Sequence, residues 1–174
     1  SGFVFWKNYT RNINQTLGDD FTAAVDLANE DDTDAALLAL DRIVDKGSDG
    51  YATIAKMKKA SLLIDKGLSD EGLSIYLDLE RNAVDQSFRD IATILYVLNS
   101  MDSNDPETLL KKIEPLENSQ VWQSSALELK AFIFLKNNNK KLAKEAFKSI
   151  LSLKTSPSSL STRARNMIEH LKEE

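Results

Sequence analysis

The sequence predicts an all-α fold, a right-handed solenoid of about four helical hairpins followed by a C-terminal capping helix. Apolar residues recur at helical spacing along nearly the whole chain. The 174 residues include only 6 Gly and 3 Pro, which disfavours the many tight turns of an all-β protein. Small residues also recur at one fixed place in successive segments, at intervals typical of a helical-hairpin repeat.

One hairpin is predicted clearly near the middle of the N-terminal half. Residues 51–67 read YATIAKMKKASLLIDKG, and their main apolar side chains share one helical stripe: Ile54, Met57, Ala60, Leu63 and Ile64. Gly67 is expected to end this helix. Residues 69–81, SDEGLSIYLDLER, form the next helix, with Ser69 as the expected N-cap and two acids in the first turn. Two helices joined by so short a link form an antiparallel hairpin.

The hairpin repeats along the chain. The first helix of each copy carries a small residue followed three positions later by a larger apolar one, and these small residues are Ala24, Ala60, Ala92 and Ala131. They are spaced by 36, 32 and 39 positions. Twelve positions further on, three of the second helices carry a small residue of their own: Ala36, Gly72 and Ala143. Such a position marks a close approach of two helix backbones.

The third copy departs from this pattern. Its second helix is capped by Asp105, starts with Pro106, lacks the small residue and ends near Pro115. A final helix starts from Ser156–Pro157, and its apolar side chains are Leu160, Ala164, Met167, Ile168 and Leu171. With no partner helix after it, this helix is predicted to cap the last hairpin.

The repeat resembles the tetratricopeptide pattern, best in SALELKAFIFLKNNNKKLAKEAFKSILSLKTSP, residues 125–157. The residues at consensus places are Leu127, Ala131, Phe134, Ala143 and Phe147. Lys130 stands where the pattern has Leu, and Pro157 comes two residues late. Agreement of the register across copies supports the resemblance more than any single copy does.

The chain also resembles a narrower family, the YfgM-like tetratricopeptide proteins of the bacterial envelope. The segments that carry this are GYATIAKMKKASLLIDKG, RDIATILYVL, IEPLENSQVWQSSALELKA and SSLSTRARNMIEHL. The resemblance implies a single-pass protein of the bacterial inner membrane, with this domain in the periplasm. It also implies association with the protein-export channel or with periplasmic chaperones and their clients.

The first residues, SGFVFWKNYTRN, suit such an anchor. Four apolar residues are too few to span a bilayer, but they resemble the last turn of a spanning helix. Its interfacial aromatic and basic side chains would be Phe5, Trp6, Lys7, Tyr9 and Arg11. Residues 1–17 are therefore predicted to be the end of the anchor and a juxtamembrane segment, and residues 18–174 the repeat domain. Packing of these aromatic side chains on the first hairpin is a compatible alternative.

The chemistry of an enzyme is not predicted. The chain has no Cys, which excludes a thiolate nucleophile, and its single histidine, His170, excludes a metal triad built from several histidines. The run EDDTD, residues 30–34, lacks the Gly and terminal Glu of a calcium loop and is better explained as helix capping. The glycines stand singly, without a phosphate loop. No catalytic residue, cofactor, metal or small-molecule substrate is expected.

Charge is unevenly distributed. Residues 19–50 carry a net charge of −8 and residues 130–174 a net charge of +6. The acidic part disfavours nucleic acid as a partner. The charged ends are either solvated helix faces or surfaces that pair with another molecule. The second possibility would make the protein a self-associating structural scaffold of the cell envelope.

The leading hypothesis is a non-enzymatic protein–protein interaction module. Hairpin solenoids expose a long face lined by the first helix of each repeat. Counting along those helices gives the candidate partner-binding residues Met57, Ile64, Arg89, Tyr96, Glu128, Phe132 and Leu135, with Ser61 and Thr93 between them. Any of these side chains could instead pack against the neighbouring hairpin.

Overall fold

The computed structural model describes the backbone of residues 2–173 and the side chains of residues 16–172. Over the described backbone the chain forms nine α-helices and one short 3-10 helix, with no strand. The predicted all-α fold is confirmed. The chain divides into two compact units, one ending at Ala92 and the other beginning at Thr93, so that the division falls within one helix, α5 (Gln86–Ser100).

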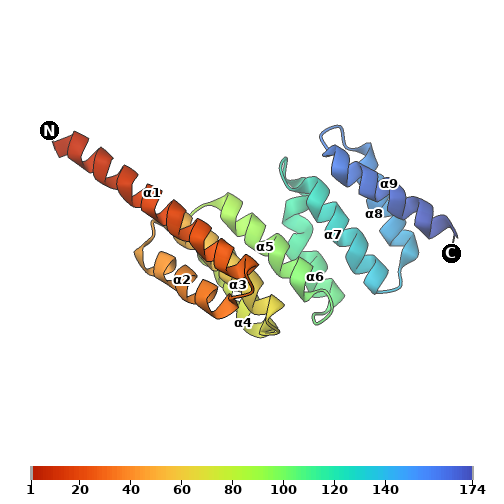
Figure 1. Cartoon of the computed structure of the whole chain (residues 1–174). Coiled ribbons are helices and arrows are strands. Elements are labelled where there is room, and N and C mark those ends of the chain that lie inside the picture. Colours follow the sequence, from red (N-terminus) through yellow and green to blue (C-terminus); the bar gives the residue numbers. More distant parts are fainter. Residues whose placement is uncertain (1, 174) are drawn as a thin grey trace. The chain divides into compact units, whose positions relative to one another are not determined.

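The N-terminal unit is a row of antiparallel helices (Figure 1). Its members are α1 (Gly2–Asn29), α2 (Thr33–Lys46), α3 (Asp49–Asp65), α4 (Ser69–Asn82) and the first half of α5. Consecutive helices pack from α1 to α4, and α1 also contacts α3. Two apolar clusters hold the unit together, one between α1, α2 and α3 and the other between α3, α4 and the start of α5.

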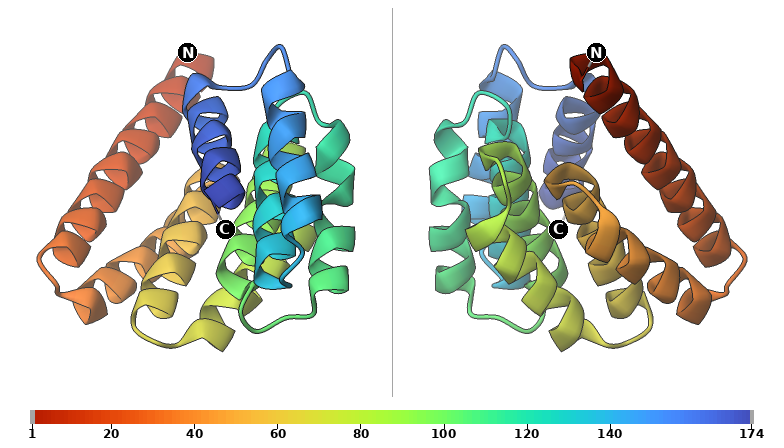
Figure 2. Two further views of the ribbon diagram at one scale, coloured as in Figure 1. Left: turned by 90° about the vertical axis from the view of Figure 1, so that its right-hand side faces the viewer. Right: turned by 90° about the vertical axis from the view of Figure 1, so that its left-hand side faces the viewer.

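The C-terminal unit repeats this arrangement (Figure 2). It contains the second half of α5, then α6 (Pro106–Ile113), η1 (Glu114–Asn118), α7 (Gln123–Lys136), α8 (Lys140–Ser152) and α9 (Ser158–Glu173). Consecutive helices pack from α6 to α9, and α7 also contacts α9. The predicted four hairpins and capping helix are therefore present, and the predicted departure in the third copy appears as the short α6 followed by the 3-10 turn at Pro115.

The small residues lie where the repeat predicts them. All four alanines of the first helices are fully buried, as are Ala36 and Ala143 in the second helices. Gly72 shows why a small residue is needed there. A Cβ atom added to it would lie 2.6 Å from the backbone oxygen of Ala60 and 2.6 Å from Cγ1 of Ile64. Helices α3 and α4 therefore touch almost backbone to backbone at this point.

The helix ends follow the predicted chemistry with one correction. Asp32 and Asp105 cap α2 and α6, each accepting a hydrogen bond from a backbone N–H three residues on. Gly67, at φ +88°, follows α3 in the left-handed conformation that glycine adopts without strain. The prediction that Ser69 caps α4 is wrong. Leu68 occupies the cap position and Ser69 is the first helical residue, because the backbone oxygen of Leu68 already accepts the first helical hydrogen bond, from the N–H of Gly72.

Candidate functional site

The open surface of α3 differs from the one predicted. Ile54, expected on the buried stripe, keeps 40% of its surface exposed, so this part of the prediction is wrong. Met57 instead packs at the edge of the apolar cluster that contains Leu79, and Ile64 lies against Gly72 of α4. Helix α3 is covered on two sides, by α2 and by α4. Because successive residues of a helix point in directions about 100° apart, a single apolar stripe cannot describe which side chains stay exposed between two such neighbours.

The predicted residues of α5 are engaged in local contacts. Arg89 donates from Nη1 to the backbone oxygen of Ala83 at 2.7 Å. The hydroxyl of Tyr96 accepts a hydrogen bond from Nδ2 of Asn104 at 2.9 Å, and Nζ of Lys112 lies 5.1 Å from the centre of its ring. Thr93 was expected on the open face, and this is wrong: it is only 8% exposed. Leu98, by contrast, is 53% exposed and was not among the predicted residues.

The predicted residues of α7 contact the capping helix α9. The carboxylate of Glu128 accepts two hydrogen bonds from the guanidinium of Arg163, at 2.8 and 2.9 Å, and these raise the pKa of Arg163 above its ordinary value. Phe132 packs edge to face on Phe147, with 5.6 Å between ring centres, and Leu135 packs on the same cluster. Since α9 contributes its own apolar residues to this cluster, all three predicted side chains also have a role in stabilising the C-terminal unit.

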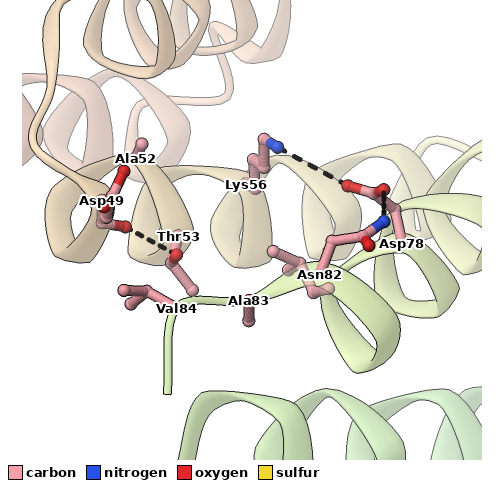
Figure 3. A pocket seen from close by; sticks show the side chains of 9 residues that line it. Asp49, Ala52, Thr53, Lys56, Asp78, Asn82, Ala83 and Val84 are labelled. Carbon is pink, nitrogen blue, oxygen red and sulfur yellow. Dashed lines mark hydrogen bonds and ion pairs between the residues drawn. The ribbon is translucent and has the colours of Figure 1, made fainter.

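A hollow of about 220 Å³ lies between α3 and α4, near the start of α3 and the end of α4 (Figure 3). Its polar side chains are paired with one another. Nζ of Lys56 lies 3.5 Å from Oδ2 of Asp78, and Nδ2 of Asn82 donates to Oδ1 of Asp78 at 2.8 Å. The hydroxyl of Thr53 donates to the backbone oxygen of Asp49 at 2.6 Å. This volume is below the 300 Å³ or more typical of ligand pockets, and the paired groups do not converge on a reacting atom.

The structure agrees with the prediction that the acidic run at residues 30–34 serves in helix capping. A second hollow, of about 490 Å³, lies beside the turn between α1 and α2 and includes Asp31, Asp32 and Asp34. Asp32 is occupied as the N-cap of α2, and Asp34 forms an ion pair with Lys66. Among the described residues, no group of three or more acidic or histidine side chains could hold a metal ion.

The fold and these surfaces can be compared with known proteins. A sequence profile described as the tetratricopeptide repeat-like domain matches residues 1–169, nearly the whole chain. The chain belongs to this tetratricopeptide repeat-like family. Neither the curated proteins nor the solved structures include a significant match to it. Tetratricopeptide repeat-like domains are typically non-enzymatic scaffolds that bind other proteins, so membership of this family indicates a protein–protein interaction module.

The family match does not test the predicted membrane anchor. The side chains of Phe3, Phe5 and Trp6 lie outside the described side chains, although the backbone there is part of α1. The predicted boundary after residue 17 falls within this helix. No helix in the described part of the chain is long and apolar enough to cross a membrane.

Proposed function

We propose that this tetratricopeptide repeat-like domain is tethered to a bacterial inner membrane by a single N-terminal helix and binds proteins in the periplasm. Its role would be ancillary to protein export or to periplasmic chaperoning. The single observation that carries the interaction function is the pair of exposed apolar side chains on first helices, Ile54 and Leu98. Apolar side chains that a repeat leaves exposed on these helices suit the apolar side chains of a protein partner.

The proposed location is supported by the first residues of the sequence and by the resemblance described above. An apolar and aromatic segment that turns basic at Lys7 is typical of the end of a membrane-spanning helix at the headgroup region. The family match covers this segment together with the repeats. The partners proposed on this basis are the export channel, periplasmic chaperones or their clients, without nucleic acid and without a small-molecule substrate.

Photocrosslinking in the native membrane tests the proposed partners. A photoreactive amino acid is placed at Ile54 or at Leu98, and at Arg81 as an exposed control on the second helix α4. We expect Ile54 and Leu98 to capture one discrete set of envelope proteins and Arg81 to capture none of them. Equal capture from all three positions would show that the first helices are not the binding surface. Capture of cytoplasmic proteins alone would contradict the proposed location.

Membrane fractionation tests the tether separately. We expect the protein, as it is made in its own cell, to stay with membranes through washes in high salt and in alkaline carbonate. Release by salt alone would indicate peripheral attachment and would contradict the anchor. Because this readout does not depend on Ile54 or Leu98, the tether and the binding surface can fail independently.

A further inference from the structure

A continuous groove follows the seam between α3 and α4, on the side where α3 also meets α2. It consists of three hollows of about 220, 190 and 410 Å³, and we call it the α3–α4 groove. The first hollow shares Lys56 and Asp78 with the second, and the second shares Lys59, Ser74 and Ile75 with the third. The hollows therefore follow one another along the two helices. The first of them is the hollow drawn in Figure 3, where the pair of Lys56 and Asp78 lies at one end.

The α3–α4 groove is long and narrow and has an apolar floor. Its lining on α3 extends from Asp49 to Leu63, about 21 Å of helix. A helix of this length and about 10 Å across would occupy roughly 1,600 Å³, more than the three hollows hold together, so the groove cannot enclose a helix. An extended segment covers the same length with about six residues. The floor offers such a segment apolar contacts from all three helices: Val44, Leu63, Ile75 and Leu79.

The lining of the groove carries more acids than bases. Both of its lysines are paired within the lining, since Nζ of Lys59 lies 2.6 Å from Oδ1 of Asp41 and Nζ of Lys56 lies 3.5 Å from Oδ2 of Asp78. Three further carboxylates belong to the lining, one at the start of α3 and two in the first turn of α4: Asp49, Asp70 and Glu71. All three are exposed, and none has an ion-pair partner among residues 16–172. Two lysines and five acids give the lining a net charge of −3.

The charges beside the groove do not cancel this surplus. The exposed charged neighbours of the lining are Asp45 on α2 and Arg81 on α4, and these two offset each other. Arg42 and Lys46 are turned by about 100° or more from the two residues of α2 that line the groove. The helix macrodipole favours acids in the first turns of α3 and α4. Because these acids stay exposed, they are also available to a cation from another molecule.

We propose that the α3–α4 groove binds an extended segment of another protein, one with apolar side chains in its middle and lysine or arginine at both ends. The apolar side chains contact the floor of the groove. The basic ends pair with Asp49 at one end of the groove and with Asp70 and Glu71 at the other. The exposed hydroxyl of Ser74, in the stretch between these ends, makes no hydrogen bond within residues 16–172, so it can bind the backbone of the segment. Ile54 lines none of the three hollows, so the inference does not depend on the surface proposed above.

Fluorescence anisotropy of a labelled peptide tests the proposed occupant. The probe has four apolar residues with two lysines on either side, and the reference peptide has glutamate in place of every lysine. We expect the whole chain to bind the lysine probe saturably, with a dissociation constant on the order of 100 µM at low salt, because each exposed ion pair contributes little. Binding should weaken as salt screens these charges, and the glutamate peptide should not bind. Absence of saturable binding, or equal binding of the two peptides, overturns the proposal.

Two variants place the peptide in the groove. Asp70→Asn with Glu71→Gln should lower the affinity about fivefold, through the loss of two exposed ion pairs. Ser74→Arg should abolish measurable binding, because it puts a bulky cation between the two ends of the groove. All three side chains are exposed, so both variants should keep the circular dichroism of the parent. Binding that survives Ser74→Arg unchanged contradicts the proposed site.

Matched controls distinguish the groove from other surfaces. Asp19→Asn with Asp26→Asn removes two exposed acids from α1, neither of which lines the groove, and should leave the affinity unchanged. A loss equal to that of the variant at Asp70 and Glu71 would reduce the binding to general charge attraction and would overturn the proposal. Leu98→Ser should also leave peptide binding intact, and loss there alone would assign the peptide to the first-helix surface instead. Self-association that Ser74→Arg abolishes, in a chain that does not bind the probe, would assign the groove to a second copy.

Discussion

Replacing Gly72 with alanine should separate α3 from α4. The new Cβ atom would lie 2.6 Å from the backbone oxygen of Ala60 and 2.6 Å from Cγ1 of Ile64. Favourable contacts between such atoms are about 3.5–4.0 Å long, so the helices must move apart by several tenths of an ångström or more. The oxygen of Ala60 belongs to a helix backbone and cannot rotate away, and so the strain falls on the packing of the whole hairpin.

The magnitude follows from two opposing effects. Overpacking of a closely packed position costs about 1–3 kcal/mol. Alanine is favoured over glycine within a helix by about 1 kcal/mol. We therefore expect Gly72→Ala to lower the free energy of unfolding by about 1 kcal/mol. Gly18 provides the matched comparison, because it also lies inside a helix of the N-terminal unit, and its added Cβ would be at an ordinary 3.5 Å from the hydroxyl of Tyr51. Gly18→Ala should raise stability by about 1 kcal/mol.

Urea unfolding followed by circular dichroism measures both variants against the parent. The difference between them should be about 2 kcal/mol, and it isolates the steric cost because the gain in helix propensity is common to both. If Gly72→Ala is as stable as Gly18→Ala, the two helix backbones are not in close contact at this position. The assignment of Gly72 to the small-residue place of the repeat would then be wrong.

Four further variants, at three positions, test other parts of the fold. Ala131→Leu should lower the free energy of unfolding by about 1–3 kcal/mol in the same urea assay, because Ala131 is fully buried between helices; a neutral result would contradict the repeat register. Asp105→Ala should lower stability at neutral pH while Asp105→Asn keeps the cap. Hydrogen bonds hold the pKa of Asp105 below its ordinary value, so the parent's advantage over the alanine variant exists above the unfolded-state pKa and is lost as pH falls through the folded-state pKa; an advantage independent of pH down to strong acid would contradict this. Phe132→Ala should destabilise by about 2 kcal/mol through loss of its contact with Phe147, and an unchanged melting temperature would leave Phe132 free to act only in binding.

The repeat itself could be predicted because it depends on a local rule. Wherever two helices cross closely, the position at the crossing must be small, and the chain shows this at Ala24, Ala60 and Ala131 without any knowledge of the fold. The caps at Asp32 and Asp105 follow equally local chemistry. These features require only neighbours in the sequence, so spacing and residue type are sufficient to locate them.

The open surface could not be predicted in the same way. Whether a side chain on a first helix is exposed depends on how that helix is rotated relative to the hairpins beside it. A rotation of the helix by the angle between two successive residues would expose Thr93 and bury a neighbouring residue instead. Thr93 is buried and Ile54 is exposed for this reason. Helical periodicity distinguishes one side of an amphipathic helix from the other, but a first helix covered on two sides or more has no single buried stripe.

The exposed surface beside the C-terminal capping helix, α9, could not be predicted from helical spacing either. The sequence predicted both that α9 would cover the last hairpin and that Glu128, Phe132 and Leu135 would line a binding face. The structure places α9 against α7, the helix that carries all three residues, and joins Glu128 to Arg163 by two hydrogen bonds. A partner that used Glu128 would have to compete with a guanidinium already held in bidentate geometry. The exposed apolar side chains of α3 and α5 face no such competition, which is why Ile54 and Leu98 are the stronger candidates for the first contact with a partner.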